Sequence, residues 1–514
     1  MNQLRIGVDV GGTNTDAVVI AGRRVITSAK RPTTADVLTG IVDALSRVLG
    51  EVEGSAVDAL MIGTTHFTNA VVEAKGLART GVLRLAGSAT RAVPPMTDWP
   101  PAIRAAVESD VHYVSGGYEY DGRQIGPIDI DEIARVGRSF RAAGIAGAAV
   151  TGVFSPVRSD QENEAARALE LAAPGLLVSR STEIGRLGLI ERENATILNA
   201  ALRPLAARIV DAFEGAVASL GVDGATLYLS QNDGTLMGAG HTRSYPVATF
   251  ASGPTNSMRG AAFLSGETDC AVIDVGGTTT DVGILRHGFP REAPMAVDIG
   301  GIRTNFRMPD LVSIGVGGGS IVREGRQVTV GPDSVGHRLT SEALVFGGRT
   351  LTATDVAVAG GLARVGDPDR VAGLDAALVR EALAVIEDQV AGALDRMKTG
   401  PDPIPVVLVG GGSIVLGHDL PGASTILKPD HSSVANAIGA ALAQVGGQAD
   451  RIVSYGTGSR REELRKVTEE AQRRCIEAGA RPDSVTVVDL DEVPLAYLPS
   501  NAVRVSARTV GDLP

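Results

Sequence analysis

Short apolar segments alternate with longer segments of helical spacing along most of this chain. Apolar runs at 4–8, 25–30, 59–63, 148–150, 227–230, 271–273 and 406–409 predict buried strands. Apolar residues three and four positions apart predict helices at 35–49, 131–143, 160–171, 190–220, 257–264, 370–397, 432–445 and 461–478. The stretch 91–131, with its prolines, is predicted to be irregular. The alternation of strands and helices predicts an α/β protein.

Two of the predicted strands lead into nearly the same turn. The first continues as Asp9-Val-Gly-Gly-Thr-Asn-Thr-Asp16 and the second as Asp274-Val-Gly-Gly-Thr-Thr-Thr-Asp281, and we call these segments the first and second glycine turns. Seven of twelve positions are identical between 9–20 and 274–285. In each copy a strand ends in an acidic residue, and a second apolar strand is predicted to leave the turn antiparallel to the first.

The residues of the glycine turns suit a phosphate group. Glycine lets backbone N–H groups approach an anion without an intervening Cβ, and the Thr hydroxyls add further donors. The leading Asp could hold a hydrated divalent cation or orient a water. One copy alone is explained equally well as a tight hairpin with incidental polar residues. The repetition of the whole pattern favours phosphate binding.

Three further stretches place small polar residues at strand ends. Gly63-Thr64-Thr65, with Asn69 beyond it, leads into a predicted helix, where ligand contact and simple helix capping are both open. Residues 315–320 are glycine-rich but lack the helix that follows a dinucleotide fingerprint, and a bulged hairpin stays open. The segment Gly410-Gly411-Gly412-Ser413 ends the apolar strand at 406–409.

Composition narrows the class of protein. With 514 residues the chain is too long for one compact core, so several domains are expected. A formal net charge of −11 and an aromatic content of 3% argue against binding to nucleic acid or anionic membranes. The chain enters a strand without a signal-peptide pattern and has no apolar run long enough to span a bilayer. We therefore expect a soluble, cytoplasmic protein.

Several common catalytic motifs are missing from the sequence. There is no Gly-x-x-x-x-Gly-Lys-Ser/Thr, no His-Glu-x-x-His and no Gly-x-Ser-x-Gly. The two cysteines, Cys270 and Cys475, offer neither a disulfide framework nor a zinc spacing, and none of the seven histidines has a paired metal spacing.

The order of the remaining elements resembles the superfamily of sugar kinases, actin and heat-shock chaperones. It runs from the first glycine turn through a long helix, the second glycine turn and the strand ending at 410–413 to a small-residue helix at 432–445. The resemblance implies an α/β fold with two duplicated actin-like ATPase domains around an interdomain nucleotide cleft. We predict domains at 1–185 and 186–448, and a small C-terminal α/β extension at 449–514.

Within this superfamily the chain resembles the hydantoinase/oxoprolinase family, A-type subunit, in a short form. The resemblance covers residues 4–445. It is carried by residues 7–13, 63–65, 68–70, 252–254, 274–281, 314–315, 317–320 and 330–334, and by Thr352, Thr354 and Asp355. Members couple ATP cleavage to the opening of a cyclic amide such as 5-oxoproline or a hydantoin, and relatives carboxylate ketones. The resemblance implies that the amide oxygen takes the γ-phosphoryl group and that water then displaces phosphate.

The same resemblance implies ATP and Mg²⁺ as cofactors and assigns the site residues. Asp9 and Asp274 would act through Mg²⁺ and a positioned water. The other assigned residues are Gly11, Gly12, Thr13, Asn14, Gly276, Gly277, Thr278 and Thr279 for the phosphates, Gly410, Gly411, Gly412 and Ser413 for adenosine, and Gly63, Thr64, Thr65 and Asn69 for the substrate.

Three departures from the family pattern bear on this assignment. Val312 stands where members often carry His, which leaves the metal contact there open, whereas Asp310 is kept as a predicted metal ligand. Residues 335–338 replace a Gly-Pro run, and the chain is shorter than a full A subunit. The short form indicates a different substrate or the lack of a B-type partner.

The predicted partners are a small cyclic amide, a B-type hydantoinase subunit and a second copy of the chain. Three alternative functions stay open. An ATPase subunit of a ketone carboxylase-like complex would use ATP only with bicarbonate. A nucleotide-driven regulatory switch would turn over ATP slowly without a substrate. A small-molecule kinase would need a catalytic base, which the sequence does not single out.

Overall fold

The computed structural model describes most of the chain. The described residues are 4–11, 14–32, 37–52, 56–86, 90–222, 224–293, 296–306, 308–455, 459–496 and 502–513. Two predicted site residues, Gly12 and Thr13, lie outside these ranges.

The first glycine turn belongs to a nine-stranded sheet. Its order is β22-β23-β21-β10-β9-β4-β1-β2-β3. The first four strands in the chain are β1 (Leu4–Val10), β2 (Asn14–Ala21), β3 (Arg24–Pro32) and β4 (Val57–Thr64). The others are β9 (Thr226–Ser230), β10 (Thr235–Gly238), β21 (Gln444–Ser454), β22 (Thr486–Pro494) and β23 (Ala502–Gly511).

A second sheet repeats the centre of the first. It is made of β11 (Cys270–Val275), β12 (Thr280–Arg286), β13 (Phe289–Pro290), β16 (Leu311–Ile314), β19 (Ile404–Val409) and β20 (Ala423–Leu427). The series β16-β12-β11-β19-β20 matches β3-β2-β1-β4-β9: three antiparallel strands followed by two parallel ones. This repetition is the duplicated α/β architecture of actin-like ATPases, and it confirms the predicted fold class.

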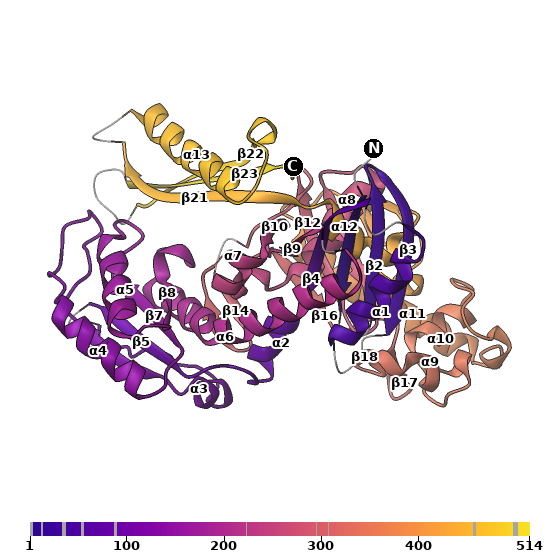
Figure 1. Ribbon diagram of the computed structural model, residues 1–514. Coiled ribbons are helices and arrows are strands. Elements are labelled where there is room, and N and C mark those ends of the chain that lie inside the picture. The colour runs from indigo at the N-terminus through magenta and orange to yellow at the C-terminus, as the bar shows by residue number, and fades with distance from the viewer. Residues whose placement is uncertain are drawn as a thin grey trace.

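A separate parallel sheet forms the lobe at the left of Figure 1, away from β1–β3. Its order is β6-β5-β7-β8, with β5 (Thr80–Leu85), β6 (Asp110–Val114), β7 (Gly147–Gly152) and β8 (Leu177–Arg180). It carries α3 (Pro101–Val107), α4 (Ile130–Ala142) and α5 (Asp160–Ala172). The prediction that 91–131 is irregular was therefore wrong for α3 and β6. Pro101 begins α3 rather than breaking it, because the first helical residue needs no N–H partner.

The C-terminal segment does not form a sheet of its own. β21 pairs with β10 in parallel, and β23 and β22 follow antiparallel, so these strands extend the first sheet. Helix α13 (Arg460–Glu477) covers these strands, and the helix and the three strands lie along the top of Figure 1. The three predicted domain ranges stay a prediction, but the first sheet takes strands from all of them.

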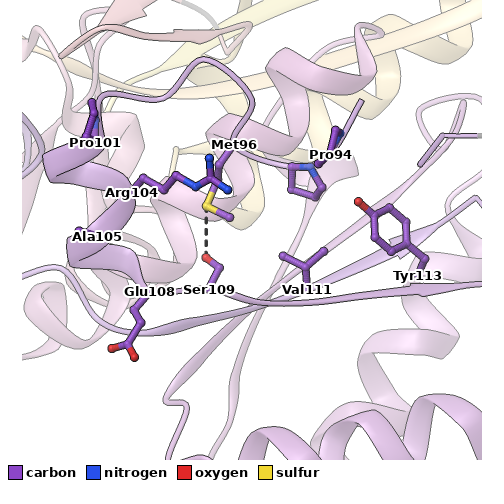
Figure 2. A pocket seen from close by; sticks show the side chains of 10 residues that line it. Pro94, Met96, Pro101, Arg104, Ala105, Glu108, Ser109, Val111 and Tyr113 are labelled. Atoms are coloured by element: carbon purple, nitrogen blue, oxygen red, sulfur yellow. Dashed lines mark hydrogen bonds between the residues drawn. The ribbon is translucent and has the colours of Figure 1, made fainter. Parts of the chain in front are cut away.

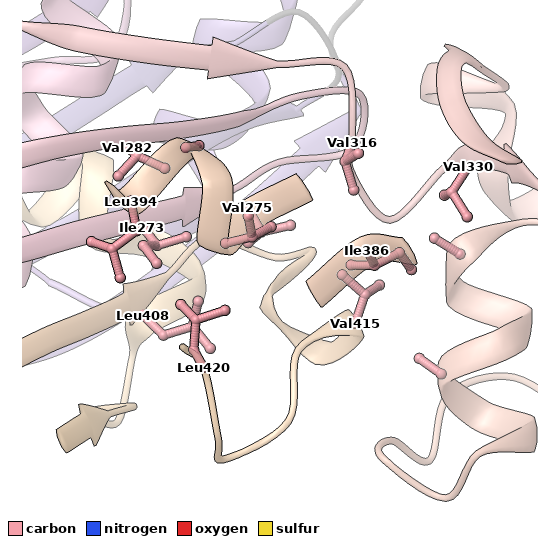
Figure 3. Packing of buried hydrophobic residues seen from close by; sticks show 14 of the residues in the cluster. Ile273, Val275, Val282, Val316, Val330, Ile386, Leu394, Leu408, Val415 and Leu420 are labelled. Carbon is pink, nitrogen blue, oxygen red and sulfur yellow. The ribbon is translucent and has the colours of Figure 1, made fainter. Parts of the chain in front are cut away.

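Long helices fill the space around the sheets. They include α1 (Val37–Leu49), α6 (Leu189–Ser219) and α11 (Ala376–Met397), with α2 (His66–Val72), α7 (Ala239–Ser244), α9 (Leu339–Glu342) and α10 (Ala353–Ala359) as shorter ones. Figure 3 shows the core of the second half, where Ile273 and Val282 of the sheet lie with Leu394 of α11. This core anchors the strand that ends in Asp274.

Two helices cross between the sheets with unusually close backbones. They are α8 (Ser252–Ser265) and α12 (Ala435–Leu442). A Cβ at Gly439 would lie 1.8 Å from the carbonyl oxygen of Asn256, and one at Gly260 would lie 1.9 Å from that of Ala435. Only glycine permits this approach.

The variant Gly439→Ala is accordingly expected to destabilise the protein by about 3 kcal/mol, since the added methyl meets backbone rather than a movable side chain. The matched control is Gly215→Ala in α6, where an added Cβ meets nothing within 4 Å, and a gain of up to about 1 kcal/mol is expected. Chemical denaturation of both variants is the measurement. Equal stability of the two variants would contradict the close crossing.

Two sequence expectations concern the molecule as a whole. Cys270 and Cys475 are both free and buried, as expected from the lack of a disulfide framework. None of the helices within the described ranges is both long and apolar enough to cross a membrane.

Candidate functional site

Both glycine turns are antiparallel hairpins of the same geometry. Asp9 pairs with Asp16 in the first, and Asp274 with Asp281 in the second. The turns are closed alike, because Gly11 N donates to Asn14 O at 3.0 Å and Gly276 N donates to Thr279 O at 2.8 Å. The predicted hairpin geometry is confirmed, and each leading aspartate stands at the end of a central strand.

Asp9 is buried and held by two amide side chains. Its carboxylate accepts a hydrogen bond from Asn256 Nδ2 at 3.1 Å and another from Asn436 Nδ2 at 3.0 Å. Burial raises the pKa of Asp9 to about 6, with the nearby Asp16 and Asp274 adding to the rise and the two amides opposing it. Ionisation of Asp9 at neutral pH therefore lowers the stability of the folded protein.

The second leading aspartate lies within electrostatic reach of the first turn. Burial raises the pKa of Asp274, the carboxylate of Asp16 raises it further, and the ammonium of Lys30 and a hydrogen bond from Ser257 lower it. Lys30 also pairs with Asp16, with Nζ 2.9 Å from one carboxylate oxygen and 3.0 Å from the other. Residues from the two halves thus share one charged site.

Asp281 completes this group of four carboxylates. Burial raises its pKa to about 6, Asp274 adds to the rise, and a hydrogen bond from Ser313 opposes it. Asp274 raises the pKa of both Asp9 and Asp281, and the ammonium of Lys30 pairs with Asp16, so the site has an excess of negative charge. A divalent cation would relieve it, which is the condition for binding phosphates beside carboxylates.

The glycine-rich loop at 315–320 supports the second turn. Gly318 N donates to Gly276 O at 3.0 Å, and Gly319 N donates to Gly277 O at 2.7 Å. A Cβ at Gly317 would lie 2.7 Å from the backbone of Gly277. The loop does lead into a hairpin of β17 (Ser320–Arg323) and β18 (Thr329–Ser334), as one interpretation predicted, but its glycines are needed where it contacts the turn. Thr278 and Thr279 stay at least partly exposed there.

The segment 410–413 packs against the same turn. Gly412 N donates to Val275 O at 2.8 Å, and a Cβ at Gly410 would lie 2.2 Å from Asp274 Oδ1. A Cβ at Gly411 would lie 4.0 Å from Lys30 Nζ, while Ser413 is buried. The structure therefore brings this predicted segment next to the carboxylates, and its contact with adenosine remains a prediction.

The predicted substrate stretch lies directly beside Asp9. Gly63 is the register partner of Asp9, and a Cβ there would lie 2.3 Å from Asp9 Oδ1. Thr64 Oγ1 is 2.5 Å from His66 Nδ1, and Thr65 Oγ1 donates to Val10 O at 3.4 Å. Asn69 is exposed and donates to Thr65 Oγ1 at 3.4 Å. Thr65, the residue before α2, makes no side-chain cap bond, but Thr64 Oγ1 accepts a hydrogen bond from His66 N, the first N–H of the helix, at 3.3 Å.

Asp310 is not brought together with the other predicted residues. Its carboxylate accepts from Arg291 Nε at 3.0 Å, so it is already neutralised by an ion pair. In the register of β12 and β16, Ser313 faces Asp281, which puts Asp310 three residues, or about 10 Å, further along the strand. Val312 packs against the hydrophobic core between the second sheet and α11. A metal role for Asp310 therefore lacks geometric support.

The residues that sequence reasoning missed come from distant segments. They are Asn256 and Ser257 on α8, Asn436 on α12 and Lys30 on β3. Each lies in or next to a segment that the sequence pattern had singled out for other reasons. Nothing in the sequence linked Asn256 or Asn436 to Asp9, so these hydrogen bonds could be found only in the structure.

A magnesium ion fits the side chains of this site only if phosphates and water complete its coordination. Among the described residues, no three His, Cys, Asp or Glu side chains are placed to hold a metal ion together. Mg²⁺ commonly binds through one or two carboxylates plus phosphates and water. Asp9, which is buried, and Asp274, which is half-buried, could supply these carboxylates.

One surface hollow lies away from these residues. It has a volume of about 580 Å³ and is lined by residues between Pro94 and Tyr113 on α3, β6 and the preceding loop. Figure 2 shows Met96 over this hollow, with Ser109 Oγ 3.3 Å from its sulfur. None of the predicted site residues lines it, so its size is no argument for the place of catalysis.

The raised pKa of Asp9 predicts a pH-dependent stability effect. The folded protein binds this proton more tightly than the unfolded chain, so stability falls as pH rises from 3.8 through about 6. The cost above pH 6 is about 3 kcal/mol. Asp9→Asn should recover about 1–2 kcal/mol at pH 8, because one hydrogen bond is lost, and almost nothing at pH 4.

Thermal unfolding at the two pH values measures this effect. The exposed Asp43 of α1, changed to Asn, is the control and should leave both midpoints unchanged. A midpoint for Asp9→Asn that is lower than that of the wild type at pH 8 would contradict the expected cost.

Comparison with known proteins agrees with this geometry. The family model described as the hydantoinase/oxoprolinase N-terminal region matches residues 5–172, and the model described as hydantoinase/oxoprolinase matches residues 192–397. The chain is 25% identical over 384 residues to the caprolactamase subunit alpha of Pseudomonas jessenii, covering 70% of this chain and 54% of that protein. It is 26% identical over 391 residues to the acetophenone carboxylase gamma subunit of Aromatoleum aromaticum, covering 69% and 52%. The chain thus spans about half the length of the curated relatives it matches.

Solved structures share the fold at low identity. A structure of ATP-dependent caprolactamase from Pseudomonas jessenii aligns with a TM-score of 0.77 and 18% identity over 99% of this chain and 88% of that one. A nucleotide-free structure of acetone carboxylase aligns with a TM-score of 0.66 and 18% identity over 100% and 88%. The two family models together span most of the chain, including both glycine turns. This chain belongs to the hydantoinase/oxoprolinase family.

Proposed function

We propose that this chain uses ATP to open a cyclic amide such as a lactam, a hydantoin or 5-oxoproline. The observation that carries the proposal is the pair of glycine turns, one from each half, whose leading aspartates repel each other across one charged site. Family membership and the similarity to caprolactamase support the reaction class.

The chemistry follows from the poor reactivity of an amide carbonyl. Its oxygen attacks the γ-phosphorus and ADP leaves, so that the oxygen becomes part of a leaving group. Water then adds to the carbon, the C–N bond breaks with the nitrogen taking a proton, and a second water releases phosphate from the acyl phosphate. The balance is one ATP and two waters for each ring opened.

The chain's own groups have distinct tasks in this sequence. Backbone N–H groups and hydroxyls of the two turns bind the phosphates from opposite sides. Asp9 and Asp274 would hold Mg²⁺, which when bound would neutralise the phosphate charge. Lys30 can balance charge between the halves. Gly63, Thr64 and Thr65 border Asp9, and we propose that they bind the amide next to the γ-phosphate.

The test is phosphate release from Mg·ATP with a panel of lactams, hydantoins and 5-oxoproline. Stimulation at least about tenfold by one compound, with a matching amount of ring-opened product, is expected. Turnover that ignores the whole panel, with or without a B-type partner protein, would overturn the proposal.

A ketone carboxylase subunit is the second candidate. It is favoured by the similarity to the acetophenone carboxylase gamma subunit and by the fold shared with acetone carboxylase. It predicts ATP use that requires bicarbonate and a ketone together. Because the matched relatives are named as subunits and only about half of their length is matched, we also propose that a partner protein completes the enzyme.

A further inference from the structure

The carboxylate of Asp9 accepts hydrogen bonds from two helices, and each helix packs mainly on a different sheet. Asn256 on α8 donates to one oxygen at 3.1 Å, and Asn436 on α12 donates to the other at 3.0 Å. These residues are 247 and 427 positions away from Asp9 in the chain. A carboxylate with both oxygens bonded from opposite helices cannot rotate without breaking one of the bonds.

Each helix packs mainly on one of the two sheets. Helix α8 packs through Met258 and Ala261 on strands of the second sheet, and α12 packs through Ala437 and Ala441 on Val18 and Ile20 of β2. α12 also touches the strand of Asp9 itself, since a Cβ at Gly7 would lie 2.0 Å from Ala437 O. The orientation of Asp9 is therefore set by both halves at once.

The two helices cannot shift independently at their crossing. A Cβ at Gly439 would lie 1.8 Å from the carbonyl of Asn256, the same residue whose side chain binds Asp9. Because the two backbones touch directly, no side chains lie between them that could adjust to a displacement of one helix. A relative movement of the halves is thus carried directly to the amide of Asn256.

Asn256 has one more polar atom at this place. Its Oδ1 is buried and accepts no hydrogen bond from any described residue, although buried amide oxygens are normally paired. A Cβ at Gly63 would lie 2.5 Å from Asn256 Nδ2 and 2.3 Å from Asp9 Oδ1, so amide and carboxylate both border the predicted substrate stretch. The free Oδ1 is an acceptor for a water or hydroxyl donor beside Asp9.

We propose that Asn256 and Asn436 are positioning residues that fix the orientation of the Asp9 carboxylate at the crossing of α8 and α12. This inference rests on the proposed function, because it assigns Asp9 a role in ATP turnover. The amides act through Asp9 and leave the phosphate contacts of the turns intact. Their loss should therefore impair the chemical step more than the binding of ATP.

The experiment measures kcat and KM for ATP in four variants: Asn256→Ala, Asn256→Asp, Asn436→Ala and Asn436→Asp. We expect kcat to fall about 10- to 100-fold with KM for ATP changed less than about threefold, as for a misoriented catalytic group. Asp has the size of Asn but puts a carboxylate against Asp9, so each Asp variant should be at least as impaired as the Ala variant.

The control is Asn199→Ala in α6. Asn199 is also buried and donates two hydrogen bonds, to Ser179 Oγ and Ser244 O, but it has no contact with Asp9. Its kcat should stay within about twofold of the wild type. Thermal unfolding of every variant shows that the fold is kept. Asn436 is only partly buried, so its variants carry the test if those of Asn256 do not fold.

The outcomes separate this inference from the proposed function. If the wild type turns over ATP in response to an amide but folded Asn variants keep their kcat, the positioning role is wrong and the proposed function stands. An Asp variant more active than the matching Ala variant would show that the amides only fill space, and would also overturn the inference. A wild type that never uses ATP would overturn both.

Discussion

Replacement of either leading aspartate, as Asp9→Ala or Asp274→Ala, is expected to lower ATP turnover by about 10³-fold while the fold is kept. Each carboxylate lies at the end of a central strand, and each faces the other turn closely enough to shift its pKa upward. Removing one would leave the phosphates without the group that holds their cation, and losses of this size are usual for preorganised electrostatic groups. Steady-state phosphate release measures the effect.

Two further variants sharpen this test. Asp43→Ala on the exposed face of α1 is the surface control and should match the wild type. Asp310→Ala distinguishes the two assignments of the metal ligands, because its ion pair with Arg291 predicts a loss of less than about tenfold. A loss equal to that of Asp9→Ala would restore Asp310 to the site, and full activity of folded Asp9→Ala would remove the glycine turns from it.

The local part of the site could be read from the sequence because it is built from adjacent residues. Asp, Gly-Gly and Thr follow one another within one hairpin, so the whole pattern is contained in a few neighbouring positions. The register of Asp9 with Asp16 and of Asp274 with Asp281 bears this out. The duplicated order of strands followed from the repeat of this one pattern.

The long-range part could not be read in this way. Asn436 meets Asp9 only because α12 packs on β2, and nothing within α12 distinguishes Asn436 from a polar residue on an exposed face. The same reason explains the C-terminal segment, where β21 finds its partner β10 about 200 residues earlier in the chain. Strand pairing is decided by the faces that the whole fold leaves uncovered, and a single sequence does not show them.

Removal of one partner of the buried ion pair between Arg84 and Glu193 is expected to destabilise the protein strongly. Arg84 lies on β5 and Glu193 on α6, both side chains are fully buried, and Arg84 Nε donates to Glu193 Oε1 at 2.8 Å. Arg84 Nη1 also donates to Val93 O at 2.8 Å. The pair thus joins the left-hand lobe of Figure 1 to the long helix that leads back to the first sheet.

Glu193→Ala should destabilise the protein by about 3–5 kcal/mol, because it leaves the guanidinium buried without a counter-charge. The matched control is Glu214→Ala on the same helix, whose partly exposed pair with Arg243 predicts a loss below about 1 kcal/mol. Adding Arg84→Met to Glu193→Ala removes the stranded charge and should restore part of the loss, since an apolar side chain can fill that volume. Chemical denaturation of the three variants decides the matter. A double variant less stable than Glu193→Ala alone would mean that the arginine's backbone contacts, and not its charge pair, hold the lobe to α6.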